Sequence, residues 1–422
     1  MNKLVKLRDR VSGGRSFAGA MAAMILSEGA NRLTRLATAI VMARYLTPWE
    51  FGIVAIAMTT AELLRVLTSS GLGAAVIKAC DERLEAVCVA TRRLTFWLYG
   101  AVFALQLAIA WPVAHAYGEP ELAWLVLGLA LPLVIYPFAS VNVFRVQRAR
   151  RSRATAAMLT MQLSLDNLLV AGLVVGGFGV WAVVWPKLVC AIVWVLVYRR
   201  LEKWQPEAAP DRATTRECWQ YSRKVLGSEC LQALRTHADK LIIAKLIGIE
   251  AAGLYYFAFN AGVGITTGLV NAFALVLLPE ICAGRNARQV QENWQRSTGM
   301  IYAVIAPLIM AQVLLAPWYV PLVFGARWTD AVPLVMLLCT GALALPLWRS
   351  VQQLLRARGQ ASLEFSVNLL LAVSSLACVF ASAPFGLTAV ALSLLVLNLV
   401  LPAVLTWFVI RQPVPAMKEA LS

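Results

Sequence analysis

The sequence predicts an all-α polytopic membrane protein, with about twelve transmembrane helices in two six-helix lobes related by a parallel pseudo-two-fold repeat. Three observations predict this class. The chain is 60% hydrophobic and only 14% charged, whereas soluble domains are about half apolar and a quarter charged. Its apolar residues come in runs of about 20, the length that a helix needs to cross the hydrocarbon core. Its basic residues are concentrated in every second connection between these apolar runs.

Twelve segments are apolar and long enough to span a membrane as helices. Transmembrane barrels alternate apolar and polar residues, and this chain does not. The predicted spans are 18–43, 51–73, 92–114, 122–143, 155–176, 179–198, 225–247, 252–278, 298–319, 331–348, 362–382 and 386–410.

The positive charge is distributed unevenly between the two sets of connections. Alternate connections, counted from the N-terminus, hold 29 of the 38 Lys and Arg residues, and the opposite ones hold only Arg327. Short loops rich in Lys and Arg stay in the cytoplasm, so both termini are predicted to be cytoplasmic. The net charge of +16 then reflects topology signals and attraction to anionic lipid. No soluble basic domain is present, which excludes a nucleic-acid role.

The eight cysteines show no CxxC pairing and no metal-ligand spacing. Most fall within or beside spans, where they behave as small apolar residues. No metal and no cofactor is therefore predicted. No GxxxxGK loop occurs, so direct use of ATP is not expected.

The two halves of the chain resemble each other around one long basic connection. Three short patterns recur in order at nearly constant offset: 43–57 as 244–258, 148–150 as 356–358, and 178–183 as 385–390. Parallel repeats of this kind are a transporter design, with the substrate between the halves. The predicted division is an N-terminal lobe over 1–200, a cytoplasmic linker over 201–223 and a C-terminal lobe over 224–422.

Several predicted spans carry ionisable or amide side chains, which usually face protein or a water-filled cavity when they lie inside a membrane. In the first span these residues fall within roughly 100° of one another on a helix. The candidate substrate-binding residues of a cationic cavity are Arg32, Arg35, Arg65, Arg235, Lys240, Asn31, Asn260 and Asn271. The candidates for ion coupling or structural ion pairs are Glu28, Glu62, Asp166, His237 and Asp239.

The charges away from the outer helix ends sum to a positive excess. The predicted spans contain six basic residues there (Arg32, Arg35, Arg65, Lys187, Arg235, Lys240) and four acidic residues (Glu28, Glu62, Asp166, Asp239). A cavity of that sign suits an anion, and arginine grips phosphate with two parallel hydrogen bonds.

The seventh span illustrates the alternatives that stay open. Arg235 and Asp239 are four residues apart and can pair along the helix, while His237 and Lys240 are expected on another face. The pair either binds substrate or only fastens helices together. His237 and Asp166 are either proton carriers or packing residues.

Several motifs resemble bacterial polysaccharide transporters that flip lipid-linked oligosaccharides, most closely exopolysaccharide exporters of the colanic-acid type. Their order along nearly the whole chain carries the resemblance: ARYLTPWEFGIVAIA (43–57), GLGAAVIK (71–78), GGFGVWAVV (176–184), ADKLIIAKLIG (238–248), AAGLYYFAFN (251–260), LLPEI (277–281) and FGARWTDAVPLVML (324–337).

The resemblance implies the superfamily that also holds multidrug exporters and the lipid II flippase, in the bacterial inner membrane. It implies a V-shaped pair of six-helix lobes with a cationic cavity, and alternating access. The implied substrate is an undecaprenyl-pyrophosphate-linked glycan for exopolysaccharide, O-antigen or capsule synthesis. A glycan polymerase and a chain-length regulator are candidate partners. Some family members carry two further C-terminal helices beyond twelve, the number of spans predicted for this sequence.

Two other functions compete with a flippase. A multidrug exporter has the same fold but exports organic cations, so its cavity should be acidic, and here the excess charge is basic. A glycan polymerase or glycosyltransferase would need a large periplasmic loop or a nucleotide-sugar domain. Neither is visible in the sequence, so no enzymatic activity is predicted.

Overall fold

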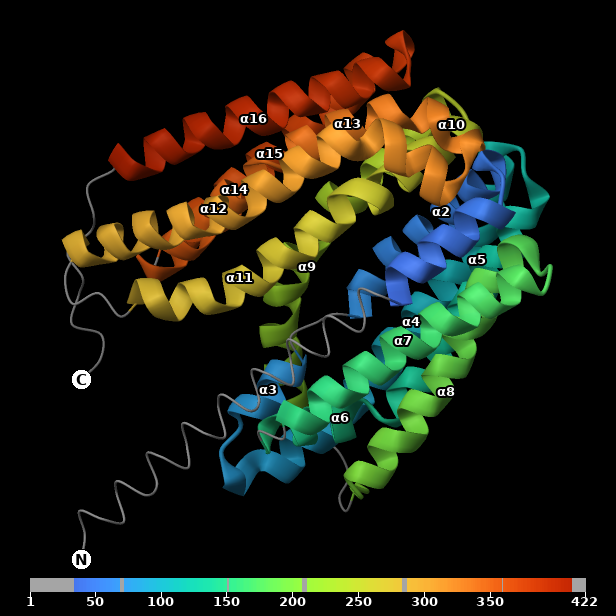
Figure 1. Ribbon diagram of the computed structural model, residues 1–422. Helices are drawn as coiled ribbons and strands as arrows, with labels where there is room; N and C mark the ends of the chain where they lie inside the picture. The colour runs from blue at the N-terminus through green and yellow to red at the C-terminus, as the bar shows by residue number, and fades with distance from the viewer. Residues whose placement is uncertain are drawn as a thin grey trace, which may run out of the picture. The chain divides into compact units, whose positions relative to one another are not determined.

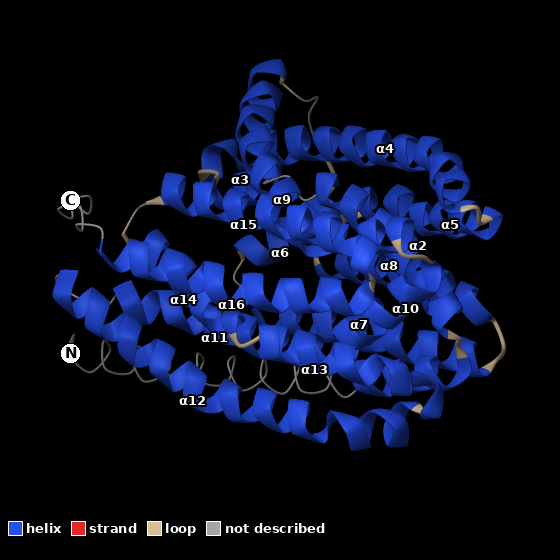
Figure 2. Cartoon of the chain, turned by 90° about the horizontal axis from the view of Figure 1, so that it is seen from above, coloured by secondary structure: helices blue, strands red, loops and turns tan. Residues whose placement is uncertain are grey.

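The computed structural model describes residues 34–68, 72–149, 152–206, 211–282, 287–358 and 360–411. All regular structure in these ranges is helical, and Figure 2 shows helices and loops only. Residues 34–45 are helical. The further elements in the first part of the chain are α2 (Pro48–Arg65), η1 (Val66–Thr68), α3 (Leu72–Lys78), η2 (Asp81–Arg83), α4 (Leu84–Tyr117), α5 (Pro120–Ile135), η3 (Tyr136–Phe138), α6 (Ser140–Arg148), α7 (Ser152–Val175), η4 (Gly179–Val183) and α8 (Val184–Leu201).

The second part of the chain begins with a long helix and repeats the plan of the first (Figure 1). Its elements are α9 (Arg212–Leu246), α10 (Ile249–Ala258), the π-helix η5 (Phe259–Val263), α11 (Gly264–Cys282), α12 (Ala287–Tyr319), the π-helix η6 (Val320–Phe324), η7 (Ala326–Ala331), α13 (Val332–Gly341), α14 (Ala344–Ala357), α15 (Ala361–Ser382), η8 (Ala383–Phe385) and α16 (Leu387–Arg411).

The all-α polytopic class is confirmed. Every predicted span lies on helical residues wherever the structure describes it, apart from short turns. Nine helices in the described ranges are long and apolar enough to cross a membrane. The α9 helix has the length but carries many charged residues, as its sequence shows. The first predicted span lies largely outside the described residues.

The fourth span of each half is broken in the middle. In the first half α5 ends at Ile135, and a short turn at Pro137 leads into α6. In the second half α13 ends at Gly341, and α14 begins at Ala344 after a short turn. The break lies at the equivalent place in both halves, as expected of a repeat. Because α14 continues to Ala357, the predicted end of that span at residue 348 is too early.

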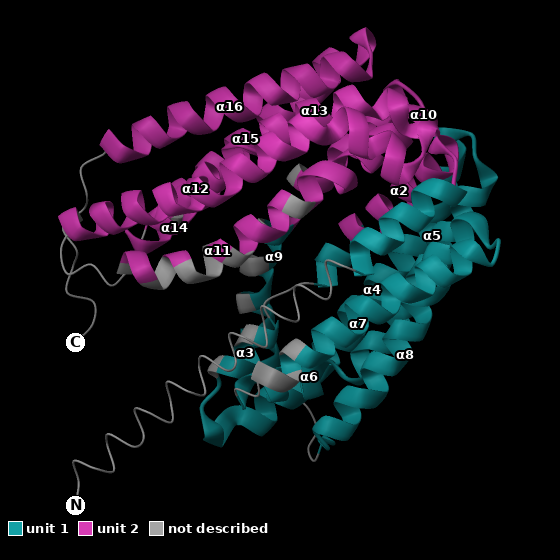
Figure 3. Ribbon diagram, in the orientation of Figure 1, with its two compact units in different colours: residues 1–45, 64–229 teal, residues 46–63, 230–422 magenta. Residues whose placement is uncertain are grey.

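The contacts divide the chain into two compact units, coloured separately in Figure 3: residues 1–45 with 64–229, and residues 46–63 with 230–422. Most of α2 therefore groups with the second unit. The division into lobes over 1–200 and 224–422 follows from the sequence repeat, and it stays a prediction. The predicted linker is helical from Arg212 onward, because Asp211 caps α9.

The Asp211 cap explains where α9 begins. The backbone N–H and the hydroxyl of Thr214 both donate to Oδ2 of Asp211, each at 3.0 Å. This arrangement satisfies one of the four free N–H groups at a helix start. These hydrogen bonds favour the ionised carboxyl, so the pKa of Asp211 lies below its usual range.

In the first unit, Arg148 ties α6 to the end of α3. Its guanidinium donates to the carbonyl oxygens of Val76 and Ile77, both at 3.2 Å, and to that of Ala79. It also pairs with Asp81 at 2.5 Å. The carbonyls at a helix end lack partners within the helix, and one arginine satisfies several of them. This basic residue, predicted as a topology signal, therefore also holds two elements together.

In the second unit, α2 and α10 approach each other at two glycines. A Cβ atom on Gly52 would overlap the carbonyl of Ile249, and a Cβ on Gly253 would overlap the carbonyl of Pro48. These glycines are counterparts in the sequence repeat. Backbone atoms of the two helices pack directly, as small residues allow in membrane proteins.

An aromatic cluster stabilises the same contact. The Phe257 and Trp328 rings stack with centroids 4.0 Å apart. Phe51 of α2 meets the edge of Trp328 at 4.8 Å, and Trp328 is fully buried. Aromatic pairs of this geometry contribute about 0.5–1.5 kcal/mol beyond the area that they bury. These contacts explain why Leu46–Leu63 belongs to the second unit.

The close approach predicts that Gly253→Ala and Gly52→Ala lower the melting temperature of the purified protein. The added methyl meets backbone rather than a movable side chain, and such overpacking costs roughly 1–3 kcal/mol. Gly100→Ala is the control, because nothing lies within 4 Å of a Cβ there. Melting is followed by intrinsic fluorescence in detergent. Unchanged melting of both glycine variants would contradict the contact.

Candidate functional site

Four of the predicted site residues are not fully described by the structure. Glu28, Asn31 and Arg32 lie outside the described residues. Arg235 lies on α9, and nothing is described of its side chain. The predicted polar stripe of the first span can thus be followed only from residue 34 onward.

The described end of the first span packs against α7 through its threonines. Thr38 donates to the carbonyl of Asn167 at 2.7 Å, and the amide of Asn167 donates to Thr34 at 3.3 Å. Thr38 is buried, whereas Arg35 is exposed. The threonines therefore serve helix packing.

A charged cluster in the first unit joins α2, α7, α8 and η3. Lys187 pairs with Asp166, with Nζ and Oδ2 2.5 Å apart. Tyr136 interacts electrostatically with both Arg65 and Asp166. The second carboxylate oxygen of Asp166 is buried and has no hydrogen-bond partner in the described part of the chain. Arg65 is exposed and Glu62 is half-buried.

A second ion pair lies in the second unit. Lys240 donates to Oδ1 of Asp239 at 3.1 Å and to the carbonyl of Thr236 at 2.9 Å. Its ammonium also lies 4.7 Å from the centre of the Phe259 ring. Tyr255 donates to Oδ2 of Asp239 at 2.8 Å. The two charged side chains are only 4% and 16% exposed.

The placement of Lys240 on a face away from Asp239 is therefore wrong. Its long side chain folds back along the helix, where it reaches the carbonyl four residues earlier, and this brings the ammonium to the neighbouring carboxylate. The net charge of the pair is zero. A contribution of Lys240 to a cationic surface stays a prediction.

The remaining predicted residues are dispersed. His237 is half-buried on α9. Asn260 lies in the π-helix η5 and donates to the carbonyl of Tyr256 at 2.8 Å. Asn271 on α11 is exposed.

A pocket of about 200 Å³ lies among the helices of the second unit. Asp239 and Tyr255 line it, together with Trp348 and Arg349 of α14. Its other polar lining residues are Thr236, Thr267, Ser375 and Asn398. Arg349 was missed as a site residue because the predicted span ended at 348, which placed Arg349 in a basic loop. A pattern in the sequence could have identified it, because polar residues recur on one helix face at Arg349, Gln352 and Gln353.

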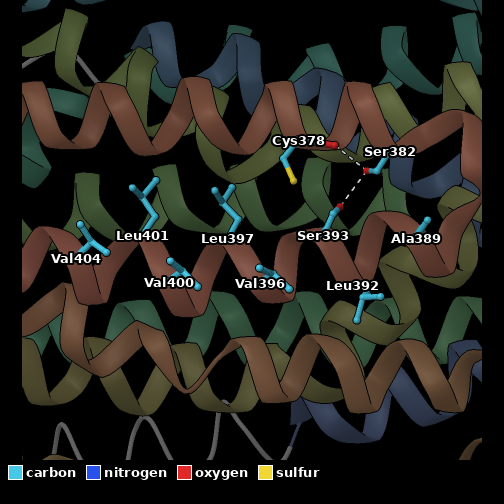
Figure 4. Close-up of a pocket in the computed structure, with 10 residues that line it drawn as sticks. All are labelled: Cys378, Ser382, Ala389, Leu392, Ser393, Val396, Leu397, Val400, Leu401 and Val404. Carbon is cyan, nitrogen blue, oxygen red and sulfur yellow. Dashed lines mark hydrogen bonds between the residues drawn. The ribbon is translucent and has the colours of Figure 1, made fainter.

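A separate groove of about 710 Å³ runs along α15 and α16. Figure 4 shows its lining, which is formed mainly by leucine and valine side chains of α16. Its hydroxyl groups bond to each other and to backbone: Ser393 donates to Ser382 at 3.0 Å, and Ser382 to the carbonyl of Cys378 at 2.6 Å. The groove is therefore apolar and suits hydrocarbon. Among the described residues, no group of three His, Cys, Asp or Glu side chains could hold a metal.

Comparison with known proteins places this arrangement in a family. The model of the polysaccharide biosynthesis protein family matches residues 41–333. The succinoglycan biosynthesis transport protein ExoT of Rhizobium meliloti is 25% identical over 92% of this chain and 78% of its own length. The lipopolysaccharide biosynthesis protein WzxC of Escherichia coli is 21% identical over 97% of this chain and 82% of its own.

Solved structures share the fold at low sequence identity. The lipid II flippase MurJ in an inward closed conformation aligns with a TM-score of 0.77 and 11% identity over 92% of this chain and 88% of that one. An inward-facing multidrug resistance transporter of the MATE family, in the MOP superfamily, aligns with a TM-score of 0.73 and 14% identity over 90% and 93%. The chain thus has the fold of these transporters and belongs to the polysaccharide biosynthesis protein family.

Proposed function

We propose that this protein is a flippase, which moves an undecaprenyl-pyrophosphate-linked oligosaccharide from the cytoplasmic to the periplasmic leaflet of the bacterial inner membrane. The observation that carries the proposal is the match to the polysaccharide biosynthesis protein family over residues 41–333. The charges inside the predicted spans support it. Two lysines neutralise two aspartates, in the Lys187–Asp166 and Lys240–Asp239 pairs. The predicted positive excess then consists of arginines.

Arginine suits the proposed substrate. A guanidinium binds phosphate oxygens with two parallel hydrogen bonds, whereas an ammonium acts as a point charge. A pyrophosphate offers several such oxygens. In this proposal Arg32, Arg35, Arg65 and Arg235 bind the pyrophosphate, and alternating access carries it across. Similarity to a named succinoglycan transport protein over 92% of the chain supports the substrate class.

A reconstituted flipping assay tests this function. Full-length protein in vesicles is given an undecaprenyl-pyrophosphate oligosaccharide with a fluorophore on its sugar, and a membrane-impermeant quencher is added. We expect the protein to make the inner-leaflet label accessible. A fluorescent phosphatidylcholine is the control lipid. If ethidium crosses and the glycolipid does not, the chain is a multidrug exporter and the proposal fails.

The arginine assignment predicts that Arg35→Ala and Arg65→Ala each reduce flipping at least tenfold at equal protein abundance. Loss of one charge-assisted hydrogen bond costs about 1.5–3 kcal/mol. The lysine variants should recover part of the rate, since lysine lacks the bidentate fork. Arg288→Ala, at a side chain 88% exposed, is the matched control. Normal flipping by both alanine variants would remove these residues from the site.

The proposed orientation predicts which loops face each side of the membrane. In a variant without native cysteines, His115→Cys at the end of α4 should react with an impermeant thiol reagent added outside intact cells. Lys203→Cys, after α8, should react only after the membrane is opened. Both positions are exposed. The reverse pattern would overturn the cytoplasmic placement of the termini.

The buried Asp239–Lys240 pair predicts strong coupling between two substitutions. Asp239→Asn leaves a buried ammonium without its counter-ion, and Lys240→Met leaves a buried carboxylate, and such losses cost about 3–5 kcal/mol. The double variant should regain stability, since neither charge remains. Melting temperature and membrane abundance measure this recovery.

Flipping by the double variant separates two roles of Asp239. If Asp239 orients Arg235 toward substrate, the double variant is stable and inactive, which is the outcome that we expect. Full recovery of flipping would show that the pair only stabilises the helices.

A further inference from the structure

Arg349 lines the pocket of the second unit without a counter-ion. Its guanidinium donates to Oε1 of Gln352 at 3.4 Å, and no carboxylate pairs with it in the part of the chain that the structure describes. The charged group that acts on it is another arginine, Arg356. Most intramembrane charges are paired, so the absence of a pairing carboxylate here requires an explanation.

The acidic groups nearby are already neutralised. Asp239 lines the same pocket, but its two oxygens accept from Lys240 and Tyr255. Glu364 receives three hydrogen bonds of 2.7–3.0 Å from Arg356. Neither carboxylate compensates Arg349. Of the two charged residues that line the pocket in the described structure, Arg349 is therefore the one without a compensating charge.

A donor next to Arg349, on Trp348, lacks a hydrogen-bond partner. Trp348 lines the pocket and is only 2% exposed. Its indole Nε1 is buried and has no hydrogen-bond acceptor among the described residues. A buried polar group left unsatisfied costs about 1–3 kcal/mol. One acceptor in the pocket could satisfy both Trp348 and Arg349.

The neighbouring residues hold the arginine in place. Gln352 is 5% exposed; it accepts from Arg349, and it donates to Asn368 of α15 at 2.9 Å. This relay fixes the amide orientation, because its nitrogen faces Asn368 and its oxygen faces the guanidinium. Asn398 of α16 supplies a further amide to the lining. The site is thus built from three helices.

The depth of Arg349 makes an accidental charge costly. It lies eight residues before Ala357, where α14 ends, which is about 12 Å at 1.5 Å per residue. Insertion scales give about 2.5–3.5 kcal/mol for a charge at the centre of a membrane helix; Arg349 lies nearer one end of the Ala326–Ala357 span, so its cost is smaller. An anion in the pocket would offset that cost.

We propose that this pocket is an oxyanion site, in which Arg349, Trp348 and Asn398 donate to one phosphate or carboxylate group. Its volume of about 200 Å³ suits a single phosphate or one acidic sugar rather than a whole lipid-linked oligosaccharide. The inference rests on the proposed function in one respect: the oxyanion belongs to the transported head group, either to its pyrophosphate or to a sugar acid.

The test measures binding by the purified full-length protein in lipid nanodiscs. Inorganic phosphate and glucuronate are the probes, with chloride at equal ionic strength as the reference. Tryptophan fluorescence and melting temperature report binding. The wild-type protein should show saturable binding of at least one probe. Phosphate alone would assign the pyrophosphate, and glucuronate alone a sugar acid.

Substitutions then locate the site. Arg349→Gln should weaken probe binding at least tenfold, Arg349→Lys less, and Trp348→Phe severalfold. Arg288→Gln, which removes an exposed charge, should bind as the wild type does. Without a probe, Arg349→Gln should melt no lower than the wild type, because it removes an uncompensated buried charge.

Three results would overturn the inference: no saturable binding of either probe to the wild type, equal binding by Arg349→Gln and Trp348→Phe, or a large drop in melting temperature for Arg349→Gln with unchanged binding. The flipping assay separates this outcome from failure of the proposed function. A wild-type protein that flips glycolipid while binding no probe keeps the function and loses the oxyanion site. A wild-type protein that binds probes through Arg349 but flips no glycolipid keeps the site and loses the flippase.

Discussion

Hydrocarbon offers no hydrogen bonds, so a chain that crosses it must satisfy its own polar groups. This constraint explains most of the polar contacts in the structure. Lys187 pairs with Asp166, and Lys240 pairs with Asp239. Arginines near helix ends bind backbone: Arg148 binds the carbonyls at the end of α3, and Arg358 donates to the carbonyl of Val409 at 3.0 Å. Trp348 Nε1 and Asp166 Oδ1 are among the buried polar atoms that lack a partner in the described residues, and for Trp348, beside Arg349, the proposed oxyanion would supply one.

The same constraint divides the basic residues by type. Lys187 and Lys240 act as counter-ions, because each compact ammonium group pairs with an aspartate. The predicted site arginines have a planar fork that suits an incoming phosphate. The net charge of the sequence could not show this division, because it counts lysine and arginine alike.

The fold was predictable because bilayer thickness imposes a length on each apolar segment. Hydropathy therefore predicted where the helices lie, and the number of spans, about twelve, stays a prediction. Local chemistry was less predictable. The span ending at 348 was cut where Arg349 interrupts the apolar run, yet α14 continues to Ala357. The angular position of Lys240 on the helix predicts that its charge lies away from Asp239, but its long, flexible side chain brings the ammonium group to the Asp239 carboxylate.

Motif order predicted the family, whereas site geometry needed the structure. The glycines at 52 and 253 were recognised as repeat counterparts, but the sequence could not show that their helices touch each other. Repeat symmetry says which positions are equivalent, and only tertiary contacts say which are adjacent. For the same reason Asn260 and Asn271, both predicted as substrate-binding residues, have different environments, one half-buried and one exposed.

The contact between α2 and α10 has a consequence for biosynthesis. Gly52 leaves the ribosome 201 residues before Gly253, and at 5–20 residues per second this delay is roughly 10–40 s. During that time α2 is already in the membrane while Phe257 and Trp328, its packing partners, have not been made. The helix must wait with its glycine face uncovered, so a chaperone or insertase that shields this face would decide how much protein matures.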